Sequence, residues 1–189
     1  MTEKRRKASA LRLFFALWPD DQLREALRQA TRKAVRASGG RPVPARNLHV
    51  TLAFLGSVAE TDRASVEAAA AAVSEPAFAF ALDRLKVWPR AKTLVLAPGS
   101  AGEGLARLHS TLWSGLGEIG YPRETRPFRP HVTLARKVAT PGEMHLAAPI
   151  GWRADAFVLV RSVTDPGGAQ YEVIGRWPLG VETRRGPDR

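Results

Sequence analysis

Cysteine is absent from this chain of 189 residues. Without thiols the protein has no disulfide, no thiolate metal ligand and no cysteine nucleophile. A chain of this kind suits a reducing compartment, so we expect a cytoplasmic location. Apolar runs of about 20 residues, the length that crosses a membrane, are also missing, and we expect no membrane association. No Gly-x-Ser-x-Gly elbow is present, which argues against a hydrolase of the serine class.

Histidine is scarce as well, with four copies in the chain. None of them shows the His-x-His or His-x-x-x-His spacing of a metal site, so we expect neither a metal nor another cofactor. We expect His109 on a helix, at the boundary between its buried and exposed faces, and His145 in a loop, and neither is a candidate for the site. The other two, His49 and His131, stand in a repeated motif.

Acidic residues are few, 18 against 29 lysines and arginines, which gives a net charge of +11. The first ten residues carry a net +3 and residues 182–189 a net +1, which leaves +7 on the part between them. Such an excess favours a polyanionic partner such as nucleic acid. A genomic base composition that favours arginine and alanine codons explains the charge equally well. We expect a disordered basic tail over 1–10, one domain over 11–180 and a flexible tail over 181–189.

Hydrophobic periodicity predicts an α+β fold. Alternating apolar residues predict strands, helical spacing predicts helices that start after Pro19 and near Gly99, and the sequence Asp-Pro-Gly-Gly-Ala predicts a hairpin turn. The expected strands are 11–18, 48–55, 79–88, 93–98, 128–138, 148–164 and 170–179, and the expected helices are 21–38, 60–74 and 99–120. Strand pairs joined by short turns indicate antiparallel sheets.

The motif His-Val-Thr-Leu-Ala occurs twice, from His49 and from His131. In a strand, alternate side chains share a face, so each histidine lies beside Thr51 or Thr133 and opposite the apolar residues. Two such strands suggest two similar lobes around one cleft. Paired imidazoles supply a base and an acid near neutral pH, and threonine hydroxyls can donate to phosphate oxygens. We therefore expect displacement at phosphorus, with activity bell-shaped around neutral pH.

The chain resembles the two-histidine (2H) phosphoesterase superfamily, and in particular its RNA 2′,3′-cyclic phosphodiesterase branch, known as the 2′-5′ RNA ligase or LigT-like family. The resemblance rests on "LRLFFALWP", "NLHVTLAFLG", "FRPHVTLAR" and "YEVIGRWPL", and it spans about residues 11–180. It implies a bilobal pseudo-twofold fold, with two antiparallel sheets flanking a central cleft and helices outside. It also implies hydrolysis of a terminal 2′,3′-cyclic phosphate of RNA to a 2′-phosphate. Members of the family also join tRNA halves through a 2′-5′ bond.

The same resemblance assigns roles to residues. It makes His49 the proton donor to the departing 3′ oxygen and His131 the base that activates water. It places Thr51 and Thr133 on the phosphate and Arg136 at the phosphate site. A regular strand would put Arg136 on the face opposite His131, so a twist or the strand end must redirect it.

Several further residues are weaker candidates. Arg129 shares the face of His131 if Pro130 leaves the strand regular, and Arg126 lies in the loop before it. Phe54 occupies the position in the first motif that Arg136 has in the second, and we expect it in the core. The aromatic residues that could stack a nucleobase are Trp18, Phe128 and Tyr171.

Three functions stay open at this point. The first is the RNA cyclic phosphodiesterase, a monomer acting on RNA ends that include tRNA fragments. The second is a 2H enzyme for small cyclic nucleotides or 2′-5′ oligonucleotides, because the loops around the cleft set the length of the substrate. The third is a non-catalytic RNA- or nucleotide-binding module, which the two intact motifs make the weakest of the three.

Overall fold

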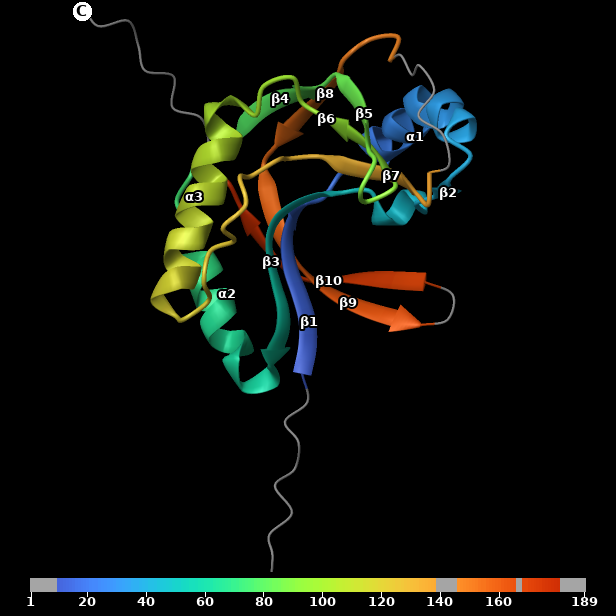
Figure 1. Cartoon of the computed structure of the whole chain (residues 1–189). Helices are drawn as coiled ribbons and strands as arrows, with labels where there is room; N and C mark the ends of the chain where they lie inside the picture. Colours follow the sequence, from blue (N-terminus) through green and yellow to red (C-terminus); the bar gives the residue numbers. More distant parts are fainter. Residues whose placement is uncertain (1–9, 139–145, 166–167, 181–189) are drawn as a thin grey trace, which may run out of the picture.

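The computed structural model describes residues 10–138, 146–165 and 168–180, which form an α+β fold (Figure 1). The strands are β1 (Ala10–Leu17), β2 (Arg41–Pro42), β3 (Val50–Ala59), β4 (Phe78–Leu82), β5 (Arg84–Trp88), β6 (Thr93–Ala97), β7 (Val132–Arg136), β8 (Ile150–Ala154), β9 (Ala156–Asp165) and β10 (Gly168–Pro178). The helices are α1 (Asp21–Ala37), α2 (Arg63–Ala71) and α3 (Gly102–Glu118), with short 3-10 turns η1 (Ala45–Asn47) and η2 (Glu60–Asp62).

The main sheet consists of two antiparallel halves that meet between the two motif strands. Its order is β10-β9-β1-β3-β7-β6-β5, with β2 beside β7. Strands β1 and β3 pair along their whole length, whereas β3 and β7 meet through the pair Val50–Val132. Each of these valines directly follows its motif histidine. The joint between the halves therefore brings His49 and His131 toward the same place.

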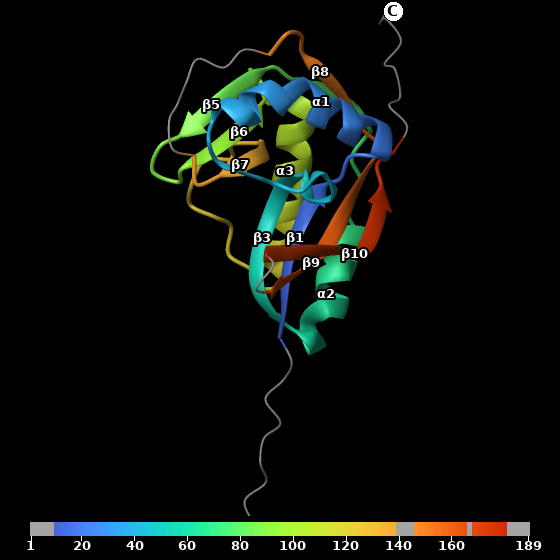
Figure 2. The same cartoon turned by 90° about the vertical axis from the view of Figure 1, so that its right-hand side faces the viewer.

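A repeated unit explains this symmetry. One copy is β1–α1–β3 and the other is β6–α3–β7, and both helices have 17 residues. Each helix packs on the motif strand of the other copy, α1 on β7 and α3 on β3. Figures 1 and 2 show the result, with α1 over one half of the sheet and α3, beside α2, over the other. The expected bilobal arrangement with helices outside is confirmed.

Two of the expected strands are each divided into two. The stretch 79–88 is divided at Asp83 into β4 and β5, and 148–164 is divided at Asp155 into β8 and β9. β4 and β8 pair with each other in a separate two-stranded sheet. Aspartate is disfavoured inside strands, and at both breaks the backbone bonds elsewhere: Asp83 donates to the carbonyl of Ala97 and Asp155 accepts from Leu179.

Strand β1 is buried on both faces. Leu13, Phe15 and Leu17 are fully buried in the main hydrophobic core. Phe14 and Ala16, on the opposite face, form a smaller cluster with Val158 and Val160 of β9, against which Trp18 and Tyr171 pack. This second cluster supports the site described next.

Candidate active site

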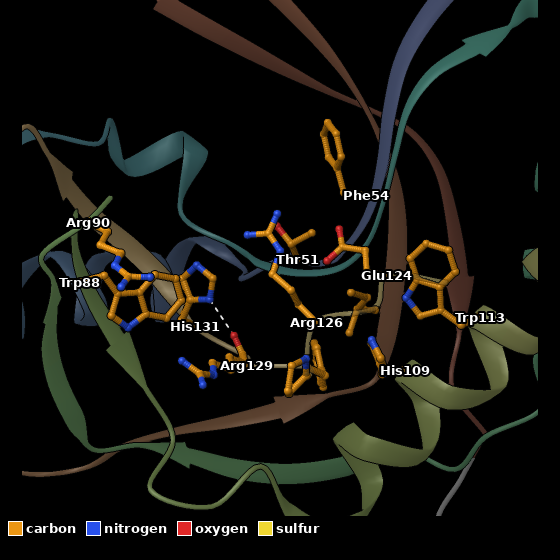
Figure 3. Close-up of a pocket in the computed structure, with 13 residues that line it drawn as sticks. Thr51, Phe54, Trp88, Arg90, His109, Trp113, Glu124, Arg126, Arg129 and His131 are labelled. Atoms are coloured by element: carbon orange, nitrogen blue, oxygen red, sulfur yellow. Dashed lines mark hydrogen bonds between the residues drawn. The ribbon is translucent and has the colours of Figure 1, made fainter. Parts of the chain in front are cut away.

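The two motif histidines are held in the same way. His49 Nδ1 lies 2.7 Å from the carbonyl oxygen of Asn47. His131 Nδ1 lies 2.7 Å from the carbonyl oxygen of Arg129, a bond that Figure 3 shows as a dashed line. A carbonyl oxygen only accepts, so each Nδ1 carries the proton and donates it. This fixes the tautomer and leaves both Nε2 atoms to accept or give a proton. His49 Nε2 lies 3.1 Å from the hydroxyl of Thr51.

Both histidines, both threonines and Arg136 line one cavity of about 320 Å³. The predicted core of the site is therefore brought together, from β3 in one half of the sheet and β7 in the other. No carboxylate is among the described residues that line the cavity. Nor do three or more histidine or acidic side chains gather as a metal site anywhere in the described part of the chain. The negative charge of a bound phosphate must therefore be stabilised by hydroxyl and guanidinium groups.

Matching β-bulges turn the residue that directly follows each motif into the cavity. Between β1 and β3 the register skips Leu52, and between β6 and β7 it skips Leu134. An extra residue reverses the alternation of side chains beyond it. Phe54 and Arg136 therefore lie on the face of the histidines, and both line the cavity. This bulge is the distortion that the position of Arg136 required.

The expectation that Phe54 is a core residue is wrong. Its side chain is 38% exposed, because the bulge points it away from the core. The guanidinium of Arg12 lies 4.7 Å from the centre of its ring, a cation–π contact. Sequence reasoning missed Arg12, which also lines the cavity. The alternation of β1 contained the signal, since Arg12 and Phe14 share the face opposite the core.

The surroundings of the two imidazoles differ. Phe14, Trp18 and Tyr171 surround His49 with ring centres 5.0 to 5.4 Å away, and Trp18 is stacked on it. His131 contacts the ring of Trp88 at 4.3 Å. Trp18, expected as a possible platform for a nucleobase, thus packs on a catalytic candidate instead.

Burial lowers the pKa of His49 from 6.5 to about 4; the bond to Asn47 raises it, and the positive charges of His131 and Arg136 lower it. Burial also lowers the pKa of His131, again with a contribution from Arg136 and against the hydrogen bond to Arg129. In the free protein both imidazoles are therefore weaker bases than an ordinary histidine.

Asn47 is a positioning residue that the sequence did not reveal. Its carbonyl accepts from His49, and its side-chain amide donates to the carbonyl of Ala169 in β10, 2.9 Å away. One buried residue thus connects the first motif to the hairpin of β9 and β10, which extends from the body of the protein in Figure 1. Tyr171 and Ser162 of that hairpin line the cavity.

The remaining candidates lie elsewhere. The side chains of Arg126 and Arg129 line a neighbouring cavity rather than the one with both histidines. His109 is 7% exposed, so it lies on the buried face of α3 and not at the expected boundary between core and surface. It is stacked on Phe128 at 3.8 Å and hydrogen-bonded to Arg123, which fixes the loop before β7 to α3. His145 lies outside the described residues.

Comparisons with known proteins agree with this geometry. The 2′-5′ RNA ligase superfamily matches residues 19–166. A protein of Escherichia coli named RNA 2′,3′-cyclic phosphodiesterase is 32% identical, over 89% of this chain and 96% of its own length. A protein of Thermus thermophilus with the same name is 33% identical, over 94% of this chain and 96% of its own length.

Solved structures give the same answer. The crystal structure of E. coli LigT complexed with 3′-AMP superposes with a TM-score of 0.83 at 31% identity, and covers 90% of this chain and 99% of that one. The ligand-free form of LigT also gives 0.83, over 91% of this chain and 99% of that one. The residues matched by the family model, 19–166, include both histidine motifs. The chain belongs to the 2′-5′ RNA ligase superfamily.

Proposed function

We propose that this protein is an RNA 2′,3′-cyclic phosphodiesterase, which opens a terminal cyclic phosphate to a 2′-phosphate. The observation that carries the proposal is the single cavity in which both histidines, Thr51, Thr133 and Arg136 meet. Relatives named for this activity, aligned over most of the chain, support it.

The reaction is an in-line displacement at phosphorus. His131 takes a proton from water as the water oxygen bonds to phosphorus, and the bond from phosphorus to the 3′ oxygen breaks. His49 gives its proton to that oxygen, so the proton balance closes within the pair. Thr51, Thr133 and Arg136 hold the non-bridging oxygens, where negative charge must be stabilised. The direction, with His49 as acid, follows the family resemblance.

The same displacement accepts an alcohol in place of water. If the 5′-hydroxyl of a second RNA attacks while the 3′ oxygen leaves, the product is a 2′-5′ phosphodiester. We include this ligation, with tRNA fragments among its substrates, in the proposal. A cytoplasmic location, a monomeric state and the three-part division at residues 10 and 180 remain predictions. In the described part of the chain no helix has the length and apolar character to span a membrane.

A product assay tests the proposal. The protein is incubated in excess EDTA with a 2′,3′-cyclic mononucleotide and with an RNA that ends in a cyclic phosphate, and the products are identified by phosphorus NMR. We expect only the 2′-phosphate isomer, because acid and base fixed in opposite halves allow one ring oxygen to leave. Failure to open either substrate would contradict the function. Equal amounts of both isomers, or activity that requires added metal, would contradict the mechanism.

A further inference from the structure

A second, larger cavity opens beside the catalytic one. Its volume is about 650 Å³, against about 320 Å³ for the catalytic cavity. The two share Thr51, Phe54, Trp88 and His131 as lining residues, so they adjoin each other. Figure 3 shows Trp88, Arg90 and His131 at one end of the second cavity and Glu124 with Trp113 at the other, with Arg126 between them.

Three arginines make the second cavity positively charged, although the reacting phosphate binds in the catalytic cavity. Arg90, Arg126 and Arg129 line it with exposed side chains, against the one carboxylate of Glu124. Within the described residues none of the three arginines forms an ion pair, whereas arginines elsewhere on the surface, such as Arg28 and Arg63, do. Unpaired guanidinium groups in a concave site are suited to a phosphodiester, which they bind through two parallel hydrogen bonds.

The size and the aromatic lining point to a nucleotide rather than a lone ion. Pockets of about 300 to 1,000 Å³ hold drug-sized ligands, so the catalytic cavity has room for one nucleotide and the second cavity for another. Half-buried Trp88 lies at the junction and also contacts His131, and Phe54 lines both cavities. Single-stranded RNA is bound in this way elsewhere, by positive grooves with aromatic rings for the bases.

We propose that the cavity lined by Arg90, Arg126 and Arg129 binds the nucleotide that precedes the terminal one, so that the preferred substrate is an RNA chain and not a cyclic mononucleotide. The inference rests on the proposed function, since it adds a subsite to that reaction. The phosphodiester between the last two nucleotides lies among the arginines, and the penultimate nucleoside lies against the aromatic rings.

Three substrates of increasing size test the subsite: a 2′,3′-cyclic mononucleotide, the same nucleotide with a 5′-phosphate, and a dinucleotide that ends in the cyclic phosphate. We expect kcat/KM to rise at each step, by about tenfold in total, the scale of a charge-assisted hydrogen bond. In Arg126→Gln and Arg90→Gln the ratio of dinucleotide to mononucleotide should fall toward one. Arg32→Gln, an exposed arginine of α1 outside both cavities, is the matched control and should keep the wild-type ratio.

The outcomes separate the two proposals. Equal kcat/KM for all three substrates would overturn the subsite and leave the proposed function intact; that result is expected if the cavity instead receives an incoming 5′-hydroxyl strand. Equal values for the 5′-phosphorylated mononucleotide and the dinucleotide would overturn the nucleoside part of the subsite. An unchanged ratio in both arginine variants would overturn the assignment of these residues. No turnover of any substrate would contradict the proposed function itself.

Discussion

At the scale of single residues, two imidazoles with the same tautomer make the most direct prediction. Replacing either His49 or His131 by alanine should reduce kcat at least about a hundredfold, the usual effect of losing a general acid or base. The measurement is turnover of a cyclic-phosphate RNA, with circular dichroism to show that each variant is folded. His145→Ala, outside the motifs, serves as the control. A folded His49 or His131 variant with normal turnover would rule out the acid–base pair.

The lowered pKa values move the expected pH optimum away from neutrality. The pH profile of kcat/KM reports the free enzyme, in which the pKa of His49 is about 4 and that of His131 lies below its ordinary value. We expect a bell with its maximum below pH 6.5. A bound phosphate is negative and raises both pKa values, so kcat should peak at a higher pH than kcat/KM.

Arg136→Gln offers a check on this electrostatic explanation. The guanidinium lowers the pKa of both histidines, so both limbs of the kcat/KM profile should move to higher pH in the variant, in addition to the loss of rate. Profiles with unchanged limbs would show that the Arg136 guanidinium does not contribute to the two pKa values.

At the scale of elements, the end of strand β7 packs closely against Gly40, the residue that directly precedes β2. A Cβ atom at Gly40 would lie 2.9 Å from the carbonyl oxygen of Arg136 and 3.1 Å from the side chain of Val138. Gly40→Ala should therefore displace the end of β7, with a loss of about 1 to 3 kcal/mol in stability and a higher KM. Thermal unfolding and steady-state kinetics measure the two effects.

Gly117→Ala is the matched control for that substitution. Gly117 lies in α3 with no atom within 4 Å of a new Cβ. Alanine favours helix over glycine, so this variant should be as stable as the wild type or more stable, by up to about 1 kcal/mol. If both variants lost stability equally, the close approach at Gly40 would not be the cause.

The elements also show how far the sequence leads. The repeated pentapeptide was sufficient to predict that the two histidines and two threonines face one cavity, because strand alternation is a local property. The redirection of Phe54 and Arg136 was not predictable in detail, since a bulge is set by the register with the neighbouring strand. The alternation of β1 places Arg12 on the face opposite the core, but the cavity position of Trp88 depends on which strands become neighbours, and no local pattern encodes that.

At the scale of the whole molecule, three histidines with lowered pKa values couple stability to pH. Burial, with the charge of Arg123, lowers the pKa of His109 to about 4, and the pKa values of His49 and His131 are lowered too. Below pH 6.5 these histidines bind protons more readily in the unfolded chain than in the folded chain. The contribution of the neutral histidines to the free energy of unfolding should therefore be complete above pH 6.5. It should decrease as the pH falls toward 4, by up to about 1.4 kcal/mol per pH unit for each histidine.

Urea unfolding at pH 7 and pH 5 measures this coupling, at pH values above the ordinary range of carboxyl groups. His109→Gln should lower stability at pH 7, because it removes the stacking on Phe128, and should reduce the difference between the two pH values. A difference as large as that of the wild type would mean that His109 does not contribute to the coupling.

The net positive charge of the chain predicts that its affinity for RNA depends on the salt concentration. With +11 on the whole chain, binding of RNA should weaken with salt, with a slope of log K against log salt of about −0.7 for each phosphate neutralised on a single strand. Fluorescence anisotropy with an RNA that ends in a 2′-phosphate, titrated at several salt concentrations, gives the slope. A chain without residues 1–9 should bind more weakly yet keep most of the slope, because Arg12, Arg126 and Arg136 line the cavities of the folded part. A flat dependence in the full chain would show that the charge is incidental to RNA binding, and a slope lost entirely with the tail would place the RNA contacts outside the cavities.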